Sequence, residues 1–524
     1  MRHKSSITID HRRILSIEDV VRFSLDKKTR ISLSSDVDFQ EKIKKNRQFC
    51  EQEITNGADI YGVTTGFGGS STKHIAKESA LKLQANLTRY HGCGIGPLLS
   101  IEQSAAVLLI RLQSNARGYS GVSLKLLEKL TQLADQRLLP AIPSIGSVGA
   151  SGDLTPLSYI AACLQGERQI YANGKLTLTA ETFKKFKIKP YVLQEKEGLA
   201  LMNGTSVMTG IATLAWAKLK RLADLACSMT GLAIEALDGR SAPFDEDLHA
   251  LKPHPGQMFA AQKIAAFVAS PDKRYFRKKM KHRKNAVQDY YSLRCAPQII
   301  GVLYDVLAWT KTILEIEINS VNDNPVFFER HRKIVNGGQF YGGHISAACD
   351  ALKTAAANTV GLLERQMLIL LDSRFNDALP DNLVDEKTLG ESASLHHGFK
   401  AMQISMSALT AEILKTSLPG SIFSRSTENH NQDVVSMGTI CARDLERIAE
   451  YAESAAAIYA LALRQAHYLR ESDREHELNN LAEKELFAFA PEFKPVVEDR
   501  AMDLEIIETG KRLFQSKELI ACTR

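Results

Sequence analysis

Ser151 stands in the stretch Gly149–Pro156, GASGDLTP, with a glycine directly after it and another two residues before it. Many hydrolases carry a nucleophilic serine in G-x-S-x-G, on a sharp turn between a strand and a helix. Here Asp153 replaces the last glycine, and the preceding LLPAIPSIGSV contains two prolines and no clean strand alternation. Both mismatches argue against a hydrolase. The small residues and glycines around Ser151, which leave its backbone unrestrained, must therefore serve a different kind of chemistry.

A second polar loop, Tyr61–Ser70, reads YGVTTGFGGS and is the densest glycine cluster of the chain. It has neither the G-K-[ST] of a phosphate-binding loop nor G-x-G-x-x-G, and no strand–helix pattern frames it. Glycines at this density indicate mobility, or close approach of the backbone to a ligand. We therefore expect a loop beside a small-molecule site, with Tyr61 as a candidate lid residue.

The overall composition is that of a globular protein: 524 residues, 44% hydrophobic, 24% charged, with a formal net charge of +6. A charge this small does not require a polyanionic partner. No apolar run has the length of a signal-peptide core or a membrane span, which predicts a soluble, cytoplasmic protein. The eight cysteines contain no C-x-x-C pair, and the adjacent His396 and His397 do not share a helix face, so no metal site is predicted.

The elements that position these loops are predicted to be helices. Between Arg443 and Arg470, apolar residues recur at steps of three and four, which indicates one long helix of about 40 Å at 1.5 Å per residue. Residues 347–372 and 401–417 show the same kind of pattern, and residues 104–116 and 123–136 predict shorter helices nearer the N-terminus. The predicted fold class is mainly α, with a central bundle of long helices and a loop-rich N-terminal region.

Six stretches then carry a family resemblance in chain order: YGVTTGFG, GSVGASGDLTPLSYIA, EGLALMNGTSVMTG, QDYYSLRCAPQIIG, NSVNDNPVF and HNQDVVSMG. Together they resemble the aromatic amino acid ammonia-lyase and aminomutase family, which includes histidine, phenylalanine and tyrosine ammonia-lyases. The resemblance runs from Tyr61 to Gly438 and implies a mostly helical homotetramer. We expect residues 1–220 to hold the tyrosine loop and the serine segment, and residues 221–524 to form the long-helix bundle and the C-terminal helices.

The resemblance also implies a reason for the GASGD stretch. In the family the matching Ala150, Ser151 and Gly152 cyclise by themselves into a methylidene-imidazolone (MIO), an electrophile that replaces any exchangeable cofactor. The amide nitrogen of Gly152 must reach the carbonyl of Ala150, a contact that bulky side chains would hinder. Ser151 is then a precursor rather than a nucleophile, and Asp153 is a candidate to assist the loss of water.

Further roles are implied by the matching motifs. Tyr61 is the expected general base; because a free tyrosine has a pKa of about 10, its loop would have to lower that pKa for activity near neutrality. Arg294 is expected to hold the substrate carboxylate through two parallel hydrogen bonds. The structural alternatives are a Tyr61 that only packs its loop and a buried salt bridge for Arg294.

The other matched site positions are Asn203, on the MIO carbonyl; Asn324, supporting the carboxylate; Gln288 and Tyr291, as polar groups; and Phe340, lining the site. Gln339 stands where the family usually has asparagine and is assigned no role.

Substrate choice depends on the stretches around Tyr90 and His91, and Glu428 to Gln432. Histidine ammonia-lyases usually carry glutamate at the position of Gln432, so Glu428, Asn431 and Gln432 resemble the amine and ring side of a phenylalanine or tyrosine pocket. A histidine at position 91 can pair with a phenol hydroxyl, which an all-carbon wall cannot; Tyr90 is the alternative partner, with His91 then structural.

These residues predict elimination of ammonia from L-tyrosine, giving p-coumarate. Phenylalanine and histidine remain alternative substrates. A tyrosine 2,3-aminomutase giving β-tyrosine is the alternative reaction. The expected partners are the small aromatic amino acid and other copies of this chain, with active sites shared between subunits and the Tyr61 loop reaching Ser151 of a neighbour.

A competing function is suggested by Lys273–Asn285, KRYFRKKMKHRKN, which is dominated by Lys, Arg and His and has the composition of a phosphate-tracking patch. The alternative is an exposed charged loop or helix face, which the weakly basic chain favours over nucleic-acid binding.

Overall fold

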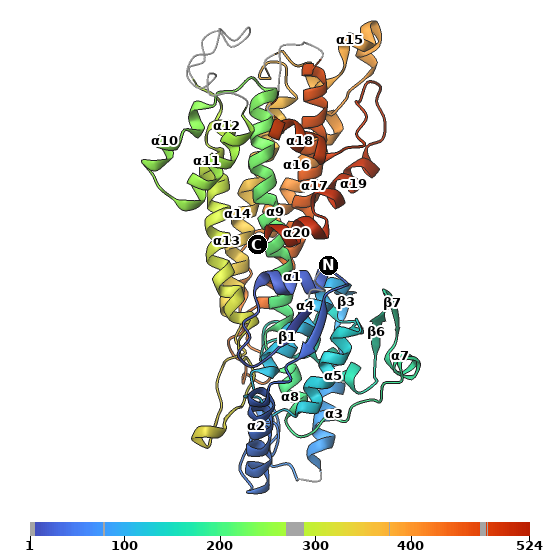
Figure 1. The fold of residues 1–524 in the computed structure, drawn as a ribbon, viewed down its shortest axis with the longest axis vertical. Helices are drawn as coiled ribbons and strands as arrows, with labels where there is room; N and C mark the ends of the chain where they lie inside the picture. The colour runs from blue at the N-terminus through green and yellow to red at the C-terminus, as the bar shows by residue number, and fades with distance from the viewer. Residues whose placement is uncertain are drawn as a thin grey trace.

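The computed structural model describes residues 6–76, 79–268, 288–376, 378–471, 478 and 480–523. Figure 1 shows an elongated, mostly helical molecule, with a bundle of long helices at one end and smaller elements around the other. The predicted mainly helical fold class is therefore confirmed. The basic segment 273–285 lies outside the described residues. Within them, no helix is long and apolar enough to cross a membrane.

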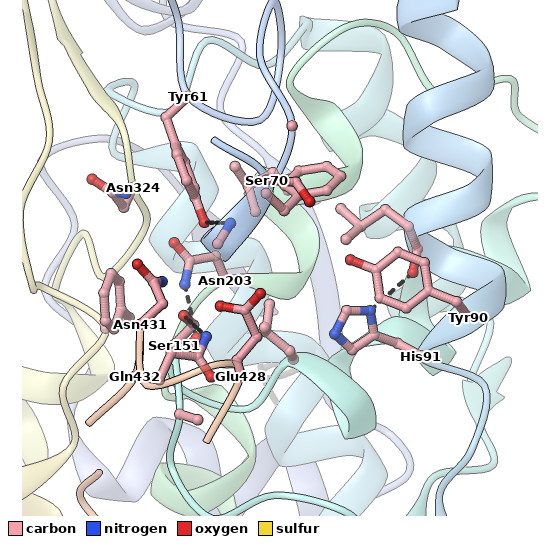
Figure 2. Close-up of a pocket in the computed structure, with 18 of the residues that line it drawn as sticks. Tyr61, Ser70, Tyr90, His91, Ser151, Asn203, Asn324, Glu428, Asn431 and Gln432 are labelled. Carbon is pink, nitrogen blue, oxygen red and sulfur yellow. Dashed lines mark hydrogen bonds between the residues drawn. The ribbon is translucent and has the colours of Figure 1, made fainter. Parts of the chain in front are cut away.

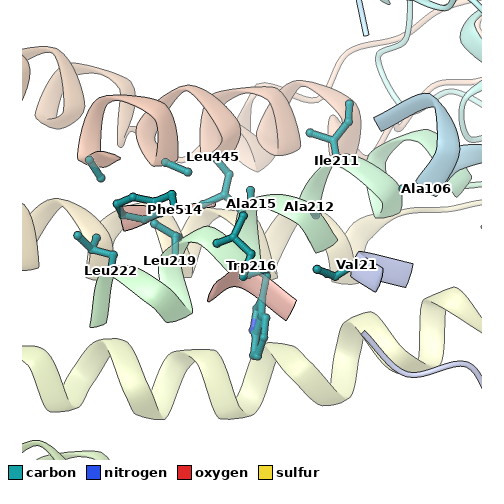
Figure 3. Packing of buried hydrophobic residues seen from close by; sticks show 14 of the residues in the cluster. Val21, Ala106, Ile211, Ala212, Ala215, Trp216, Leu219, Leu222, Leu445 and Phe514 are labelled. Atoms are coloured by element: carbon teal, nitrogen blue, oxygen red, sulfur yellow. The ribbon is translucent and has the colours of Figure 1, made fainter. Parts of the chain in front are cut away.

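The central bundle consists of five long helices: α9 Ser206–Ala236, α13 Ala296–Ile318, α14 Gly343–Leu370, α16 Lys400–Thr416 and α17 Gly438–Glu471. Helices α13, α14 and α17 pack against α9, and α16 packs on α14 and α17. Figure 3 shows α9 side chains such as Leu219 packed close to Leu445 of α17, while Trp216 points toward α13. The Trp216 indole N–H donates to the Leu307 carbonyl at 3.0 Å, which satisfies its one polar atom in the core.

The helix predicted between Arg443 and Arg470 is confirmed as α17, which begins five residues earlier. The expected seam along it is buried, including Leu445, Ala452 and Tyr459. The patterns at 347–372 and 401–417 correspond to α14 and α16. The predicted division at residue 220 falls inside α9 and stays a prediction.

Smaller helices and short strands lie around the N-terminal end of α9 and the C-terminal end of α13 (Figure 1). The helices are α1 Ile17–Leu25, α2 Val37–Thr55, α3 Ala80–Tyr90, α4 Ile101–Ala116, α5 Leu124–Asp135, α6 Leu154–Leu164, α7 Thr179–Phe186 and α8 Glu197–Met202. The strands form the pairs β1 Ser6–Ile9 with β2 Arg30–Leu33, β3 Ile95–Leu98 with β5 Pro143–Ile145, and β8 Val326–Phe328 with β9 Lys333–Val335, and the three-stranded sheet β4 Leu139–Pro140, β6 Gln169–Ala172, β7 Lys175–Leu178. Among the strands of the described residues, β1 and β2 pair in parallel and the other pairs are antiparallel.

The other end of the bundle carries short helices on its outside (Figure 1). They are α10 Glu246–Ala250, α11 Pro255–Phe267, α12 Tyr291–Arg294, α15 Glu386–Leu389, α18 Asn480–Phe489 and α19 Asp503–Leu513, while the last helix, α20 Ser516–Cys522, lies midway along the molecule (Figure 1) and packs on α9 and α1. Of these, α12 begins just after the gap at 269–287 and packs on α13 and α14. Polar residues of the matched motifs therefore lie at both ends of the molecule.

Candidate active site

The Ala150–Gly152 triplet forms a tight left-handed turn directly before α6. Ser151 has φ 51°, and the flanking Gly149 and Gly152 have φ 79° and 75°. A Cβ added to Gly152 would lie 2.2 Å from the Gly204 carbonyl oxygen, so only glycine fits there. The turn brings three consecutive residues into a compact loop, as ring closure between the first and the third requires. The residues present therefore fit the MIO group implied by the sequence.

Two amide side chains hold Ser151 in place (Figure 2). The Asn203 side-chain amide donates to the Ser151 carbonyl at 2.7 Å, and the Gln432 amide donates to the Ser151 hydroxyl at 2.9 Å. Asn203 follows α8 and Gln432 lies in the loop before α17, so segments far apart in the sequence meet at the serine. The expected contact between Asn203 and this carbonyl is present in the structure.

Asp153 lies fully buried behind the turn. One of its oxygens accepts hydrogen bonds at 3.0 Å from the backbone N–H groups of Val207 and Met208, in the first turn of α9. The other accepts from the hydroxyls of Ser147 and Thr439. Burial raises the pKa of Asp153 to about 6, against the lowering effect of these hydrogen bonds. This carboxyl is thus able to exchange a proton near neutrality, directly beside the Ala150–Gly152 triplet.

Tyr61 reaches into the same cavity from the glycine loop. Its phenol oxygen accepts a hydrogen bond from the Gly68 N–H at 2.8 Å, at the start of the short 3-10 helix η1 Gly68–Ser70. Burial raises the pKa of Tyr61, Gly68 lowers it, and the charge of Glu428 raises it further. The net direction within one chain is upward, opposite to the lowering expected from its proposed role.

Glu428 connects the loop before α17 to the tyrosine loop. Both of its carboxylate oxygens accept from the Gly69 N–H, at 3.0 and 3.1 Å. Glu428, Asn429 and His430 all have positive φ values, of 51°, 52° and 64°, which is a strained conformation for three consecutive non-glycine residues. The strained turn therefore places a carboxylate directly against the lid.

His91 and Tyr90 form another wall of the cavity, at the C-terminal end of α3. The His91 Nδ1 lies 3.0 Å from the Leu87 carbonyl oxygen; because a carbonyl only accepts, Nδ1 carries the proton. Burial lowers the pKa of His91, which favours the neutral ring, and raises the pKa of Tyr90 to about 12. Nε2 is then an acceptor, and in Figure 2 it points toward the pocket interior. A neutral acceptor at this position suits a ligand that donates a hydroxyl proton.

These groups line one cavity of about 720 Å³. Eleven of the predicted site residues line it: Tyr61, Tyr90, His91, Ala150, Ser151, Asn203, Asn324, Phe340, Glu428, Asn431 and Gln432. Gly152 lies directly behind Ser151 and is buried. The cavity also has an apolar lining that the sequence motifs do not indicate, chiefly Phe67, Ile75, Leu83, Leu87, Leu154, Leu199 and Val434. Leu83 and Leu87 stand four residues apart before His91, and this helical spacing was an available signal.

Three predicted residues, Gln288, Tyr291 and Arg294, lie elsewhere; we call them the distal cluster. Tyr291 and Arg294 are in α12, at the opposite end of the bundle, where Tyr291 is 71% exposed and the Arg294 guanidinium lies 4.5 Å from its ring. Gln288, shortly before them, is exposed. Within one chain the long helices separate these three residues from Ser151 (Figure 1), so their expected roles at the substrate stay predictions.

The length of α9 accounts for the distance between the distal cluster and the Ser151 pocket. The Gln366 side-chain amide donates both to the Ser292 carbonyl beside the distal cluster and to the Thr230 hydroxyl of α9. From Met208, beside the pocket floor, to Thr230 the helix rises roughly 33 Å at 1.5 Å per residue. Tyr61, in contrast, shares its cavity with Ser151 of its own chain, so the expectation that the Tyr61 loop reaches a neighbour's serine is wrong.

No cluster of three His, Cys, Asp or Glu side chains suited to a metal ion occurs within the described residues.

A family model described as aromatic amino acid lyase matches residues 15–488. Tyrosine ammonia-lyase of Cereibacter sphaeroides is 40% identical over 475 residues, which cover 88% of this chain and 89% of that protein. Histidine ammonia-lyase of Bacillus velezensis is 36% identical over 449 residues, covering 84% and 85%. The crystal structure of tyrosine aminomutase from Streptomyces globisporus has a TM-score of 0.89 at 33% identity, covering 99% of this chain and 98% of that one. The chain is thus an enzyme of the aromatic amino acid lyase family, among whose relatives are both ammonia-lyases and an aminomutase.

Proposed function

We propose that this enzyme eliminates ammonia from an aromatic L-amino acid, with L-tyrosine as the first choice, and that it uses an MIO group formed from Ala150, Ser151 and Gly152. One observation carries the proposal. The left-handed turn at Ser151 is held by Asn203 at the serine carbonyl and opens into the cavity that also contains the phenol of Tyr61. An electrophile and a base on opposite sides of a ligand-sized space suit removal of an amine and a proton from adjacent carbons.

When formed, the MIO group supplies an electrophilic carbon in place of an exchangeable cofactor. Asn203 binds the carbonyl oxygen next to that carbon, and Tyr61 in its deprotonated form accepts the β-proton of the substrate. The Glu428 carboxylate is available to attract the substrate ammonium. Phe340 and the apolar lining exclude water from the ring side of the cavity.

The choice of tyrosine rests on His91. With Nδ1 bonded to the Leu87 carbonyl, Nε2 accepts a hydrogen bond from the phenol hydroxyl and holds the far end of the ring. Phenylalanine leaves this acceptor without a donor, which disfavours it relative to tyrosine. The 40% identical tyrosine ammonia-lyase supports the same substrate.

A complete site needs a second chain. We infer a homotetramer in which the distal cluster of one subunit approaches the pocket of another, so that Arg294 holds the substrate carboxylate. The bundle supports such an assembly, because large apolar side chains on α13 and α16 are at least half exposed: Val302, Trp309, Ile316, Ile404 and Leu414. Exposed apolar surface on α16 and on α13, against which α12 with Tyr291 and Arg294 packs, suits a contact between copies.

A tyrosine 2,3-aminomutase is the second candidate, and the contact between Glu428 and Gly69 favours it. A carboxylate that holds both the lid and the departing ammonium would retain the amine long enough for its return to the β-carbon. The structural similarity to tyrosine aminomutase supports this alternative.

Product analysis after incubation with L-tyrosine tests the proposal. We expect p-coumarate and ammonia as the early products, and we expect mass spectrometry of the peptide containing Ala150–Gly152 to show the loss of two water molecules. Ser151→Ala, which cannot lose the second water, is the matched control and should be inactive. β-Tyrosine as the main early product would replace the lyase by the aminomutase. An unmodified peptide in fully active enzyme would refute the MIO chemistry.

A further inference from the structure

A buried arginine lies behind the Ser151 turn. Arg111 of α4 has a relative exposure of 0%. Its Nη1 donates to the Asn203 carbonyl at 3.1 Å and to the Asn322 side-chain oxygen at 3.0 Å, and its Nη2 lies 3.3 Å from the Ser114 hydroxyl. One guanidinium nitrogen thus joins the residue that binds the Ser151 carbonyl to the segment that leads to Asn324.

The contact between this guanidinium and the turn is tight. A Cβ built on Gly204 would lie 2.0 Å from Nη1 of Arg111 and 2.3 Å from the Asn322 oxygen. On the other side, the Gly204 carbonyl accepts from the Asp153 N–H at 2.7 Å and leaves no room for a side chain on Gly152. The triplet, the Asn203–Gly204 backbone and Arg111 therefore form three layers in direct contact, and displacement of one layer displaces the next.

The charge of Arg111 is kept despite its burial. Desolvation lowers the pKa of Arg111 to about 10, while Asp323 and Asp153 oppose the fall, so the guanidinium remains cationic near neutral pH. Asp323 also pairs with Lys196, whose side chain is fully buried as well. Taking such groups out of water is costly, and an apolar side chain would fill the space at lower cost. A role in orientation explains why a guanidinium occupies this position.

We propose that Arg111 is a positioning residue for formation of the MIO group: it holds the Asn203–Gly204 backbone as the surface against which the Ala150–Gly152 triplet closes. This inference rests on the proposed function. It goes beyond that function by assigning a role to a residue that does not touch the cavity.

The reaction that depends on this placement needs no external reagent. The Gly152 nitrogen forms a bond to the Ala150 carbonyl carbon, and the carbonyl oxygen leaves as water with the protons of the Gly152 and Ser151 amides. The Ser151 Cα proton and hydroxyl leave as a second water, which creates the exocyclic double bond. Both steps require the Ser151 carbonyl and the Gly152 backbone to stay where Asn203 and Gly204 hold them.

Arginine suits this role better than lysine. Its planar guanidinium presents several donors in fixed directions, and two acceptors from different segments, Asn203 and Asn322, lie within reach of one nitrogen while Ser114 faces another. A lysine ammonium keeps the charge and lacks this fixed geometry. Arg111→Lys therefore separates the orientation of the backbone from the charge balance with Asp153 and Asp323.

The test follows the mass of the Ala150–Gly152 peptide at intervals after a short pulse of protein synthesis. Arg111→Lys should lengthen the half-time of water loss by about tenfold or more, the effect of one lost hydrogen bond to a charged group. Ser114→Ala removes the longest contact of Arg111 and a long, 3.4 Å hydrogen bond from the Ser114 hydroxyl to Asn322, leaves both Nη1 contacts in place, and should cyclise at the wild-type rate. Thermal unfolding and the elution volume of each variant establish that the comparison is between folded proteins.

The outcomes separate the inference from the function on which it rests. A wild-type chain that is active and never loses water would refute the proposed function and, with it, the inference. A wild-type chain that cyclises, together with a folded Arg111→Lys chain of unchanged half-time, overturns the inference alone. Should Arg111→Lys fail to fold, Asn322→Ala removes one anchor of the guanidinium; a longer half-time there supports the proposal, and the wild-type half-time overturns it.

Discussion

The pocket and the distal cluster both contain residues matched to one active site, yet their surroundings differ. Around the pocket, Ser151 and Glu428 have hydrogen-bond partners within the same chain, and the cavity is bounded by several segments. At the distal cluster, Tyr291 is largely exposed and the Nε of Arg294 is buried without a hydrogen-bond partner in the described part of the chain. One end is a preformed cavity and the other is a surface. In the proposed homotetramer the two ends complete each other between copies.

The strongest test of this difference mixes two inactive variants. Ser151→Ala disables the pocket, and Arg294→Ala should lower kcat/KM more than about thirtyfold, since truncating one partner of a buried charge pair costs about 2 kcal/mol or more. Refolding the two chains together in equal amounts should restore activity at about a quarter of the sites, those with one intact pocket and one intact distal cluster. Activity is measured with L-tyrosine on gel-filtered, mixed oligomers.

The control pair is Ser151→Ala with Tyr61→Phe. Both residues belong to the same cavity of one chain, so no mixed assembly contains an intact pocket with both groups. We expect no recovery. Recovery from this pair, and none from the first, would reverse the assignment of residues to the two ends.

A second test addresses the pocket alone. His91→Phe removes the acceptor for the phenol hydroxyl, and a buried unpaired hydroxyl costs about 1–3 kcal/mol. The ratio of kcat/KM for tyrosine over phenylalanine should fall about ten- to a hundredfold. Equal losses on both substrates in cyclised, folded enzyme would make His91 a structural residue and transfer the test to Tyr90.

The pH profile distinguishes charges contributed by the two ends. Tyr61 acts deprotonated and burial raises its pKa, so kcat/KM should rise with pH, about tenfold per unit below that pKa. Glu428→Gln removes a negative charge that raises the pKa of Tyr61 and should move this rise to lower pH. Arg294→Gln removes a cation brought by the other chain and should move it to higher pH. Shifts of the same sign in both variants would show that the distal cluster does not face Tyr61.

The smallest effect is expected at the lid. Gly69→Pro removes the N–H that binds Glu428, whereas Gly69→Ala keeps it and places its Cβ at an ordinary 3.6 Å from the carboxylate. We expect kcat/KM to fall about three- to tenfold in the proline variant, the effect of one exposed hydrogen bond, and to change little in the alanine variant. Any β-tyrosine formed should fall relative to p-coumarate as the amine escapes. If both variants have the same kcat/KM and the same ratio of β-tyrosine to p-coumarate, the contact between Glu428 and Gly69 has no role in the lid.

Sequence periodicity identified α17 because one face of it meets other helices and the rest carries charge. The same approach missed α9, the helix at the centre of the molecule. Nearly every residue of α9 from Ser206 to Ala236 is buried, so it has no polar face from which an amphipathic period can be recognised. Helix α13 was missed as well. Its exposed face carries large apolar residues such as Trp309, which blur the contrast between faces.

The motifs identified most of the pocket, because Ser151, Asn203 and Tyr61 stand in short stretches with distinctive sequences. They gave no information on which chain supplies each group, since the separation of the distal cluster depends on the lengths of helices that connect it to the pocket. The direction of the shift in the Tyr61 pKa could not be predicted from the sequence either. It depends on burial and on the approach of Glu428, which is far away in the sequence.

The length of α9 has a consequence for how this chain can change. A subunit whose pocket meets the distal cluster of another copy must keep both ends at a fixed separation and rotation for a closed assembly. Each residue added to or deleted from a helix changes its rise by 1.5 Å and its rotation by about 100°. Insertions and deletions are therefore expected to be accommodated in surface loops such as the turn at Asn173 and Gly174, and to be rejected within α9.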